Sequence, residues 1–150
     1  MTMPTTSIRW ALAKHLIDTI RNSADATGVL IEPGWPGQQN LRADTVWIDD
    51  IGDSTNDIVV MSGGRSIRDD FFTITVLSRV AGRSSLDATM TRLSELAALI
   101  EDPIADSATL DDFEGVVSAD FVITAQTAGI TPEGAIGYAA AEVRIHSRLS

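Results

Sequence analysis

The segment from Asp70 to Ile104 limits the possible folds more than any other part of the chain. Its first part, Asp70–Val80, alternates between apolar and more polar side chains, which predicts a long strand with one face against a core. Its second part, Leu86–Ile100, carries apolar residues at helical spacing and predicts an amphipathic helix. The predicted strand face carries Phe72, Ile74, Val76 and Val80, and the predicted helix stripe carries Leu86, Met90, Leu93, Ala97 and Ile100.

The sequence also predicts where this helix begins and ends. Ser84 is the expected N-cap, and Asp87 three residues later resembles the acidic partner of a capping box. Pro103 is expected to end the helix, because proline lacks the backbone N–H that a helix interior needs. An acidic loop is expected from Ala105 to Asp112.

A second predicted helix precedes the long strand and runs from Ser7 to about Ala24. Thr5 or Thr6 is its expected N-cap, and Gly28 lies just beyond its expected end. Its predicted apolar stripe consists of Ile8, Ala11, Leu12, His15, Leu16, Thr19 and Ile20.

The remaining patterns predict strands and turns. Pro33–Gly37 is expected to form a rigid loop, because it combines two prolines with two glycines. Taken together, the patterns predict a single α+β domain over residues 1–150, with two helices packed on one face of a largely antiparallel sheet. The shorter predicted strands are Val29–Ile31, Thr45–Ile51 and Ile58–Met61, and a C-terminal hairpin is expected from Val116–Thr127 and Tyr138–His146.

Composition narrows the classes of function. The net charge is −10, from 21 acidic against 11 basic residues, so a module that grips nucleic-acid phosphates is disfavoured. The chain has no cysteine, which excludes disulfides, thiolate metal sites and a cysteine nucleophile. No apolar run reaches the roughly 20 residues of a membrane-spanning helix. These features give no support to a cofactor or a membrane partner.

Four acids, Asp49, Asp50, Asp53 and Asp57, surround a predicted turn. They do not follow the ligand spacing of a calcium loop, so we interpret them as solvated turn residues. The segment Ser62–Ser66 contains two glycines but lacks the lysine of a phosphate-binding loop, which favours a hairpin loop.

The two histidines, His15 and His146, are not accompanied by a nucleophile motif. The acid pairs Asp69–Asp70 and Asp111–Asp112 lie at predicted strand starts, where like charges normally remain in water. The sequence therefore predicts no catalytic or metal-binding residue.

Candidate partner contacts come from exposed aromatic and charged residues. Of the three tryptophans, Trp10, Trp35 and Trp47, we expect one to be an interface anchor, and we single out Trp35, in the Pro-Gly loop. The expected loop from Ser62 to Asp69 places an apolar residue between two cations, and these cations could meet a neighbouring copy's carboxylates. The predicted subunit-interface residues are Arg65, Ile67, Arg68, Asp111, Asp112 and Trp35.

The order of these elements resembles the tail terminator proteins of long-tailed bacteriophages, a family of minor tail or tail-completion proteins. The resemblance lies in the first helix (Ser7–Ala24), the early strand ending in the Pro33–Gly37 loop, the Asp70–Val80 strand, the Ser84–Ile100 helix and the C-terminal hairpin. It covers nearly all of the chain and concerns its layout.

This resemblance implies a structural virion protein that is not an enzyme and needs no cofactor. It implies a homo-oligomeric ring, a hexamer, that caps the tail tube and forms the joining surface to the head–tail connector. The implied partners are the tail tube protein and the connector protein, while DNA passes through the lumen without specific binding and no membrane takes part. The implied location is the neck region of the virion tail, after assembly in the host cytoplasm.

Other functions remain open from the sequence. Within the same class, the chain could be a head–tail connector or a tail tube subunit. From a different class, it could be a small ligand-binding α+β module, or a hydrolase that uses the acid clusters. The oligomeric mass distinguishes these classes, since a ring favours assembly and a monomer with a deep polar cleft favours ligand binding.

Overall fold

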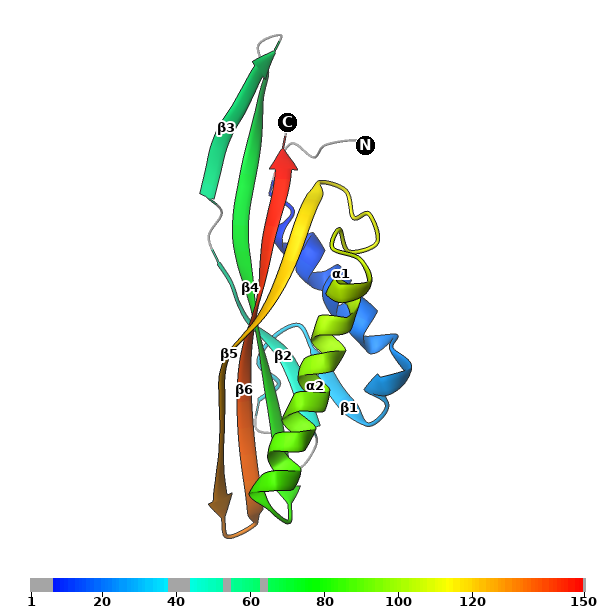
Figure 1. Ribbon diagram of the computed structural model, residues 1–150, viewed down its shortest axis with the longest axis vertical. Helices are drawn as coiled ribbons and strands as arrows, with labels where there is room; N and C mark the ends of the chain where they lie inside the picture. Colours follow the sequence, from blue (N-terminus) through cyan, green and yellow to red (C-terminus); the bar gives the residue numbers. More distant parts are fainter. Residues whose placement is uncertain (1–6, 38–43, 53–54, 63–64, 150) are drawn as a thin grey trace.

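The computed structural model describes residues 7–37, 44–52, 55–62 and 65–149 (Figure 1). The expected caps Thr5 and Thr6 lie outside these described residues. The described residues form two long helices and six strands, with one short 3₁₀ helix at Ala24–Ala26. In chain order the elements are α1 (Arg9–Arg21), β1 (Val29–Glu32), β2 (Asp44–Ile51), β3 (Thr55–Ser62), β4 (Arg65–Arg83), α2 (Leu86–Asp106), β5 (Val116–Thr131) and β6 (Gly134–Leu149).

The strands form one sheet in the order β1-β2-β4-β6-β5, and β3 pairs with the first part of β4. Every pair is antiparallel except β1 with β2, which is parallel. The prediction of an α+β class with a largely antiparallel sheet is confirmed. The C-terminal hairpin is also confirmed, although its strands are longer than expected, because the ladder continues to Thr131 and only Pro132 and Glu133 lie between β5 and β6.

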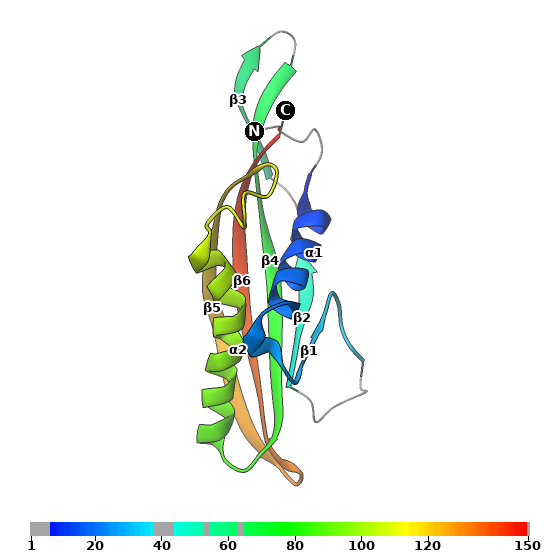
Figure 2. The same cartoon turned by 90° about the vertical axis from the view of Figure 1, so that its right-hand side faces the viewer.

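Strands β4 and β6 form the central ladder of the sheet. Their register runs from Arg68 opposite Leu149 to Arg83 opposite Ala135. Within the described residues, Arg65–Ile67 of β4 lie beyond the last described residue of β6, Leu149, and pair only with β3. Figures 1 and 2 show this β3–β4 hairpin projecting beyond the rest of the sheet.

The structure corrects the expected loop from Ser62 to Asp69. Ser62 ends β3, while Arg65, Ile67 and Arg68 belong to β4, with Arg65 directly opposite Ser62. Only Gly63 and Gly64, outside the described residues, separate the two strands in sequence. Gly-Gly is a sequence typical of two-residue hairpin connections, which let the ladder reach almost to the tip.

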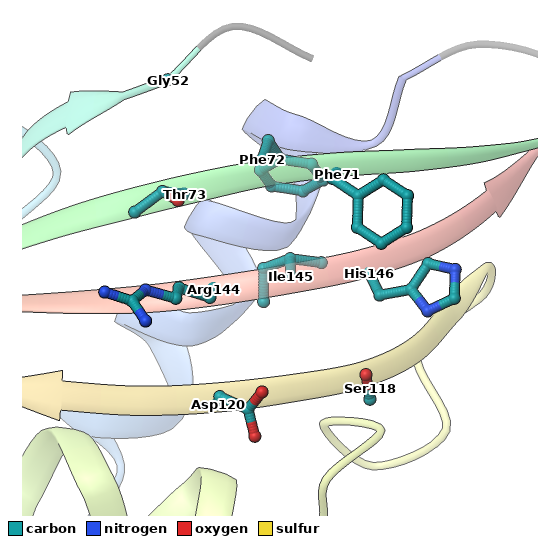
Figure 3. Close-up of a pocket in the computed structure, with 9 residues that line it drawn as sticks. All are labelled: Gly52, Phe71, Phe72, Thr73, Ser118, Asp120, Arg144, Ile145 and His146. Atoms are coloured by element: carbon teal, nitrogen blue, oxygen red, sulfur yellow. The ribbon is translucent and has the colours of Figure 1, made fainter. Parts of the chain in front are cut away.

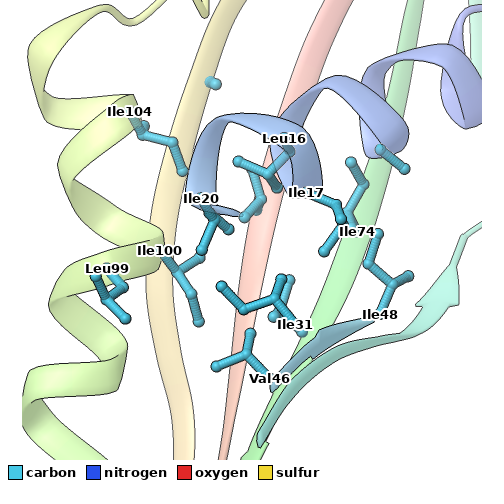
Figure 4. Packing of buried hydrophobic residues seen from close by; sticks show 14 of the residues in the cluster. Leu16, Ile17, Ile20, Ile31, Val46, Ile48, Ile74, Leu99, Ile100 and Ile104 are labelled. Atoms are coloured by element: carbon cyan, nitrogen blue, oxygen red, sulfur yellow. The ribbon is translucent and has the colours of Figure 1, made fainter. Parts of the chain in front are cut away.

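One hydrophobic cluster joins the helices to the sheet (Figure 4). It contains Phe72, Ile74, Val76 and Val80 from β4, so the predicted alternation of the long strand is confirmed. Close packing of such side chains supplies most of the stabilisation of a domain of this size. Figure 4 shows Leu16, Ile17 and Ile20 from α1 and Leu99, Ile100 and Ile104 from α2 meeting Ile31, Val46, Ile48 and Ile74 from the strands.

The buried stripe of α1 is shifted from the prediction. Ala13 and Ile17 are buried, whereas Ala11 is exposed and His15 and Thr19 are only partly covered. The helix also ends early, at Arg21, because Ser23 caps a separate 3₁₀ turn by accepting a hydrogen bond from the Asp25 N–H. The core therefore lies on an adjacent face of the same helix.

Both predicted ends of α2 are wrong by a few residues. Ser85, not Ser84, is the N-cap, and its hydroxyl accepts a hydrogen bond from the Ala88 N–H at 3.1 Å. Pro103 does not end the helix, which continues to Asp106 and so includes Ala105 from the expected loop. Proline removes one donor near the C-terminus, but the Ser107 N–H still bonds to the Pro103 carbonyl and closes a final turn.

Candidate functional site

The side of the sheet that carries Phe71, Thr73 and Arg79 of β4 points away from the hydrophobic cluster, because neighbouring strand residues face opposite ways. We call this side the outer face. A depression of about 530 Å³ lies over it between β4, β6 and β5 (Figure 3). It is lined by Gly52, Phe71, Phe72, Thr73, Ser118, Asp120, Arg144, Ile145 and His146.

A charged cluster lies at one end of this depression. The Asp69 carboxylate accepts a hydrogen bond from Arg148 Nε at 3.1 Å, and His146 Nε2 lies 2.9 Å from the same oxygen. The contact with His146, helped by Arg148, lowers the pKa of the Asp69 carboxyl against the opposing effect of burial. Phe71 stacks on His146 with ring centroids 4.5 Å apart. The cluster fixes β4 against β6 where the β3–β4 hairpin begins.

Two polar side chains of the depression, His146 and Arg144, are held by neighbouring groups. Ser118 is opposite His146 in the β5–β6 register, but no hydrogen bond joins them among the described residues. His146 is held by Asp69 and Phe71 instead. Arg144 pairs with Glu142 on its own strand.

A second feature of the outer face is Arg79, which lies beside two tryptophans that contact each other. Its guanidinium carbon is 6.0 Å from the Trp35 ring centroid and 5.9 Å from that of Trp47, and the two rings meet edge-on. Arg79 is only 1% exposed, while Trp35 is 60% exposed. Thr45 accepts a long hydrogen bond from Arg79 at 3.4 Å. The stack therefore fixes the predicted interface anchor Trp35 to the sheet with much of its ring in solvent.

We expect Arg79→Ala to destabilise the fold by about 2 kcal/mol, because a desolvated cation over aromatic rings contributes on that order. Tryptophan emission should shift to the red as water reaches the rings. Urea unfolding followed by fluorescence measures both effects. Arg79→Met is the matched control, since it keeps most of the packing and removes the charge. An alanine variant as stable as the original chain would show that the stack is not a stabilising contact.

The structure places the predicted interface residues in three separate regions. Arg65, Ile67 and Arg68 lie on the first part of β4, at the projecting hairpin. Trp35 follows β1, in the segment between β1 and β2. The described contacts do not bring these groups together within one chain.

Asp111 and Asp112 lie in the loop between α2 and β5. Together with Leu110 they adopt positive φ angles of 52° to 61°, the left-handed region that aspartate tolerates better than most residues. Asp112 accepts a hydrogen bond from Thr109, and Asp111 lies 3.9 Å from His15 Nε2. Both carboxylates are exposed and available to another molecule.

Sequence reasoning missed Asp69, His146, Arg148 and Arg79 as parts of a site. Asp69 and His146 were considered only for catalysis, and the cross-strand register that joins them is not visible in a linear sequence. Over the described residues, no group of three or more His, Asp or Glu side chains could hold a metal ion. Over the same part of the chain, no helix has the length and apolarity to cross a membrane.

No protein-family model matches this chain, and no curated protein matches its sequence. Its function is therefore inferred from its own residues and layout.

Proposed function

We propose that this chain is a structural, ring-forming virion protein of the tail terminator kind. In this proposal it caps the tail tube of a long-tailed phage and presents the surface that joins the head–tail connector. Its partners are further copies of itself in a hexameric ring, the tail tube protein and the connector protein. DNA passes through the lumen without specific binding, and the protein lies in the neck region of the tail. It performs no catalysis.

The observation that carries the proposal is the projecting β3–β4 hairpin. An isolated two-stranded ribbon is only marginally stable in water. Among the described strands, residues 65–67 pair with β3 alone, so a neighbour that packs on the hairpin would stabilise it. The layout of two helices, a long central ladder and a C-terminal hairpin agrees with the resemblance noted from the sequence.

The predicted interface residues lie apart on one chain, as the contact in a ring requires. A ring forms when one surface of each copy meets a different surface of the next copy, so the two halves of the contact lie apart on each chain. Arg65 and Arg68 are on the hairpin, while Asp111 and Asp112 are on the α2–β5 loop. Such charges would set the register of the contact more than its strength.

We expect the chain to form rings at micromolar concentration and Ile67→Asp to abolish them. The substitution introduces a carboxylate at a half-buried apolar position of the hairpin. The formation of rings by the original chain should weaken only mildly with added salt. Salt screens charge pairs at the edge of the contact and does not weaken apolar contacts. Mass photometry and negative-stain imaging measure both. Thr91→Asp is the matched control, because it makes the same charge change at an exposed position of α2.

Two outcomes would contradict the proposal. An original chain that stays monomeric and fails to decorate purified tail tubes would favour a small ligand-binding module instead. Loss of rings in Thr91→Asp as well as in Ile67→Asp would show that added charge alone prevents association. Specific decoration along a tube rather than at its end would favour a tube subunit, and binding to the connector alone would favour a head–tail connector.

A further inference from the structure

Strand β5 forms one margin of the sheet and has an unpaired backbone edge. It is 16 residues long and pairs only with β6 among the described strands. Long exposed edges invite another strand to add to the sheet, and proteins commonly protect them with charges, proline, bulges or a covering element. β5 has register shifts near Val116 and at Ile123–Ala125, but after the second shift it pairs regularly as far as Thr131.

The chemistry of β5 suits association between copies of this acidic chain. Residues 121–131 contain no charged side chain, although 32 of the 150 residues of the chain are charged. Residues 123–127 are all exposed, and Ile130 is the most exposed large apolar residue at 70%. Two chains of net charge −10 can approach along such a neutral strip without opposing carboxylates.

The opposite margin of the sheet is β3. At the level of Phe71 the sheet is four strands wide, with Thr55 of β3 opposite Phe71, Phe71 opposite His146, and His146 opposite Ser118 of β5. β3 pairs only with β4 in the described part of the chain, so it too has a free edge. It spans 8 residues and carries one charged residue, Asp57.

We propose that the edge of β5 binds strand β3 of a second copy of this chain, so that the sheet continues from one copy to the next. This proposal rests on the proposed function, since it names the two surfaces of the ring contact. The strand directions agree with it. Because β3–β4, β4–β6 and β6–β5 are each antiparallel, β3 and β5 run in opposite directions. An axis parallel to the strands would place β3 of the next copy level with only Val116–Ser118 of β5. A ring axis inclined to the strands keeps β3 antiparallel to β5 and can shift it along β5 toward residues 121–131.

Pairing of β5 with β5 of another copy is the main competing arrangement. It needs a two-fold axis and uses the same edge in both chains, so it closes as a dimer. The β5–β3 contact uses different edges and can repeat around a ring. It also gives the projecting hairpin the neighbour that a two-stranded ribbon lacks.

Cysteine cross-linking can test this arrangement because the natural chain has no cysteine. Val60→Cys on β3 would be combined in turn with Val117→Cys, Ile123→Cys or Gln126→Cys, three exposed positions along β5 that sample different registers. Mild oxidation of assembled protein should give a ladder of covalent multimers for at least one combination, and reductant should remove it. Val60→Cys with Thr91→Cys on α2 is the matched control and should give no ladder.

The outcomes separate this proposal from the proposed function. Rings that form without any cross-linked multimers from the β5–β3 cysteine pairs would overturn the strand pairing, while the proposal of a ring would stand. Dimers from a single β5 cysteine would instead indicate two-fold β5–β5 pairing and also overturn it. An original chain without rings would overturn both proposals. Hydrogen exchange of the unsubstituted chain is a second measurement, and amides of both β3 and β5 should become protected on assembly; exchange unchanged in either strand would contradict the pairing.

Discussion

Leu93→Ala is expected to lower the free energy of unfolding by about 2–5 kcal/mol, the usual cost of removing a buried leucine. Leu93 has no exposed surface and lies in the middle of α2, packed in the hydrophobic cluster that joins helices and sheet. Truncation removes three carbons and leaves a cavity that the surrounding helix and strands can fill only in part. Urea unfolding at a concentration where the chain is monomeric measures the loss.

Leu86→Ala is the matched control for this prediction. Leu86 is on the same helix and was assigned to the same stripe from its spacing, yet it is 43% exposed at the first turn. The same chemical change there should cost well under half as much, because most of the removed surface is already in water. Equal losses in the free energy of unfolding at the two positions would show that α2 does not bury the face that carries Leu93.

The different burial of Leu93 and Leu86 illustrates what hydrophobic periodicity predicts and what it does not. Alternation from Phe72 to Val76 and helical spacing around Leu93 identify the buried side of an element, because burial follows the geometric repeat. Spacing does not report where the partner surface ends, so Leu86 continues the stripe without being covered. Similarly, proline is a poor helix residue, but α2 continues from Pro103 to Asp106, because one missing donor does not prevent the next turn from closing on the Pro103 carbonyl.

The outer face was less predictable for a different reason. Asp69 and His146 are far apart in sequence, and only the β4–β6 register brings them together. The contact of Arg79 with both Trp35 and Trp47 likewise needs three segments to meet. A charged residue at an alternating strand position is normally expected in solvent. A sequence pattern cannot show that a tryptophan from a distant loop covers it.

Gly137→Ala is the second substitution with a large expected effect, and we expect it to cost about 1–3 kcal/mol through overpacking. A Cβ atom at this position of β6 would lie 2.6 Å from Thr89 Cγ2 and 2.8 Å from Leu93 Cδ1, closer than such atoms can approach. Both neighbours are fully buried on α2, so neither can move into solvent. Thermal or urea unfolding measures the cost. Gly129→Ala is the control, because a Cβ there meets no atom within 4 Å.

A double-mutant cycle can measure how much of this cost comes from the contact with Thr89. Thr89→Ser removes the methyl group that approaches most closely but keeps the hydroxyl that donates to the Ser85 carbonyl at 2.9 Å. If Thr89 is the rigid side of the contact, Gly137→Ala should cost less in the Thr89→Ser background, with a coupling of about 0.5–3 kcal/mol. Strictly additive losses would mean that α2 moves as a body to admit the new methyl group. The close approach of α2 to β6 would then be an adjustable contact rather than one fixed by Gly137.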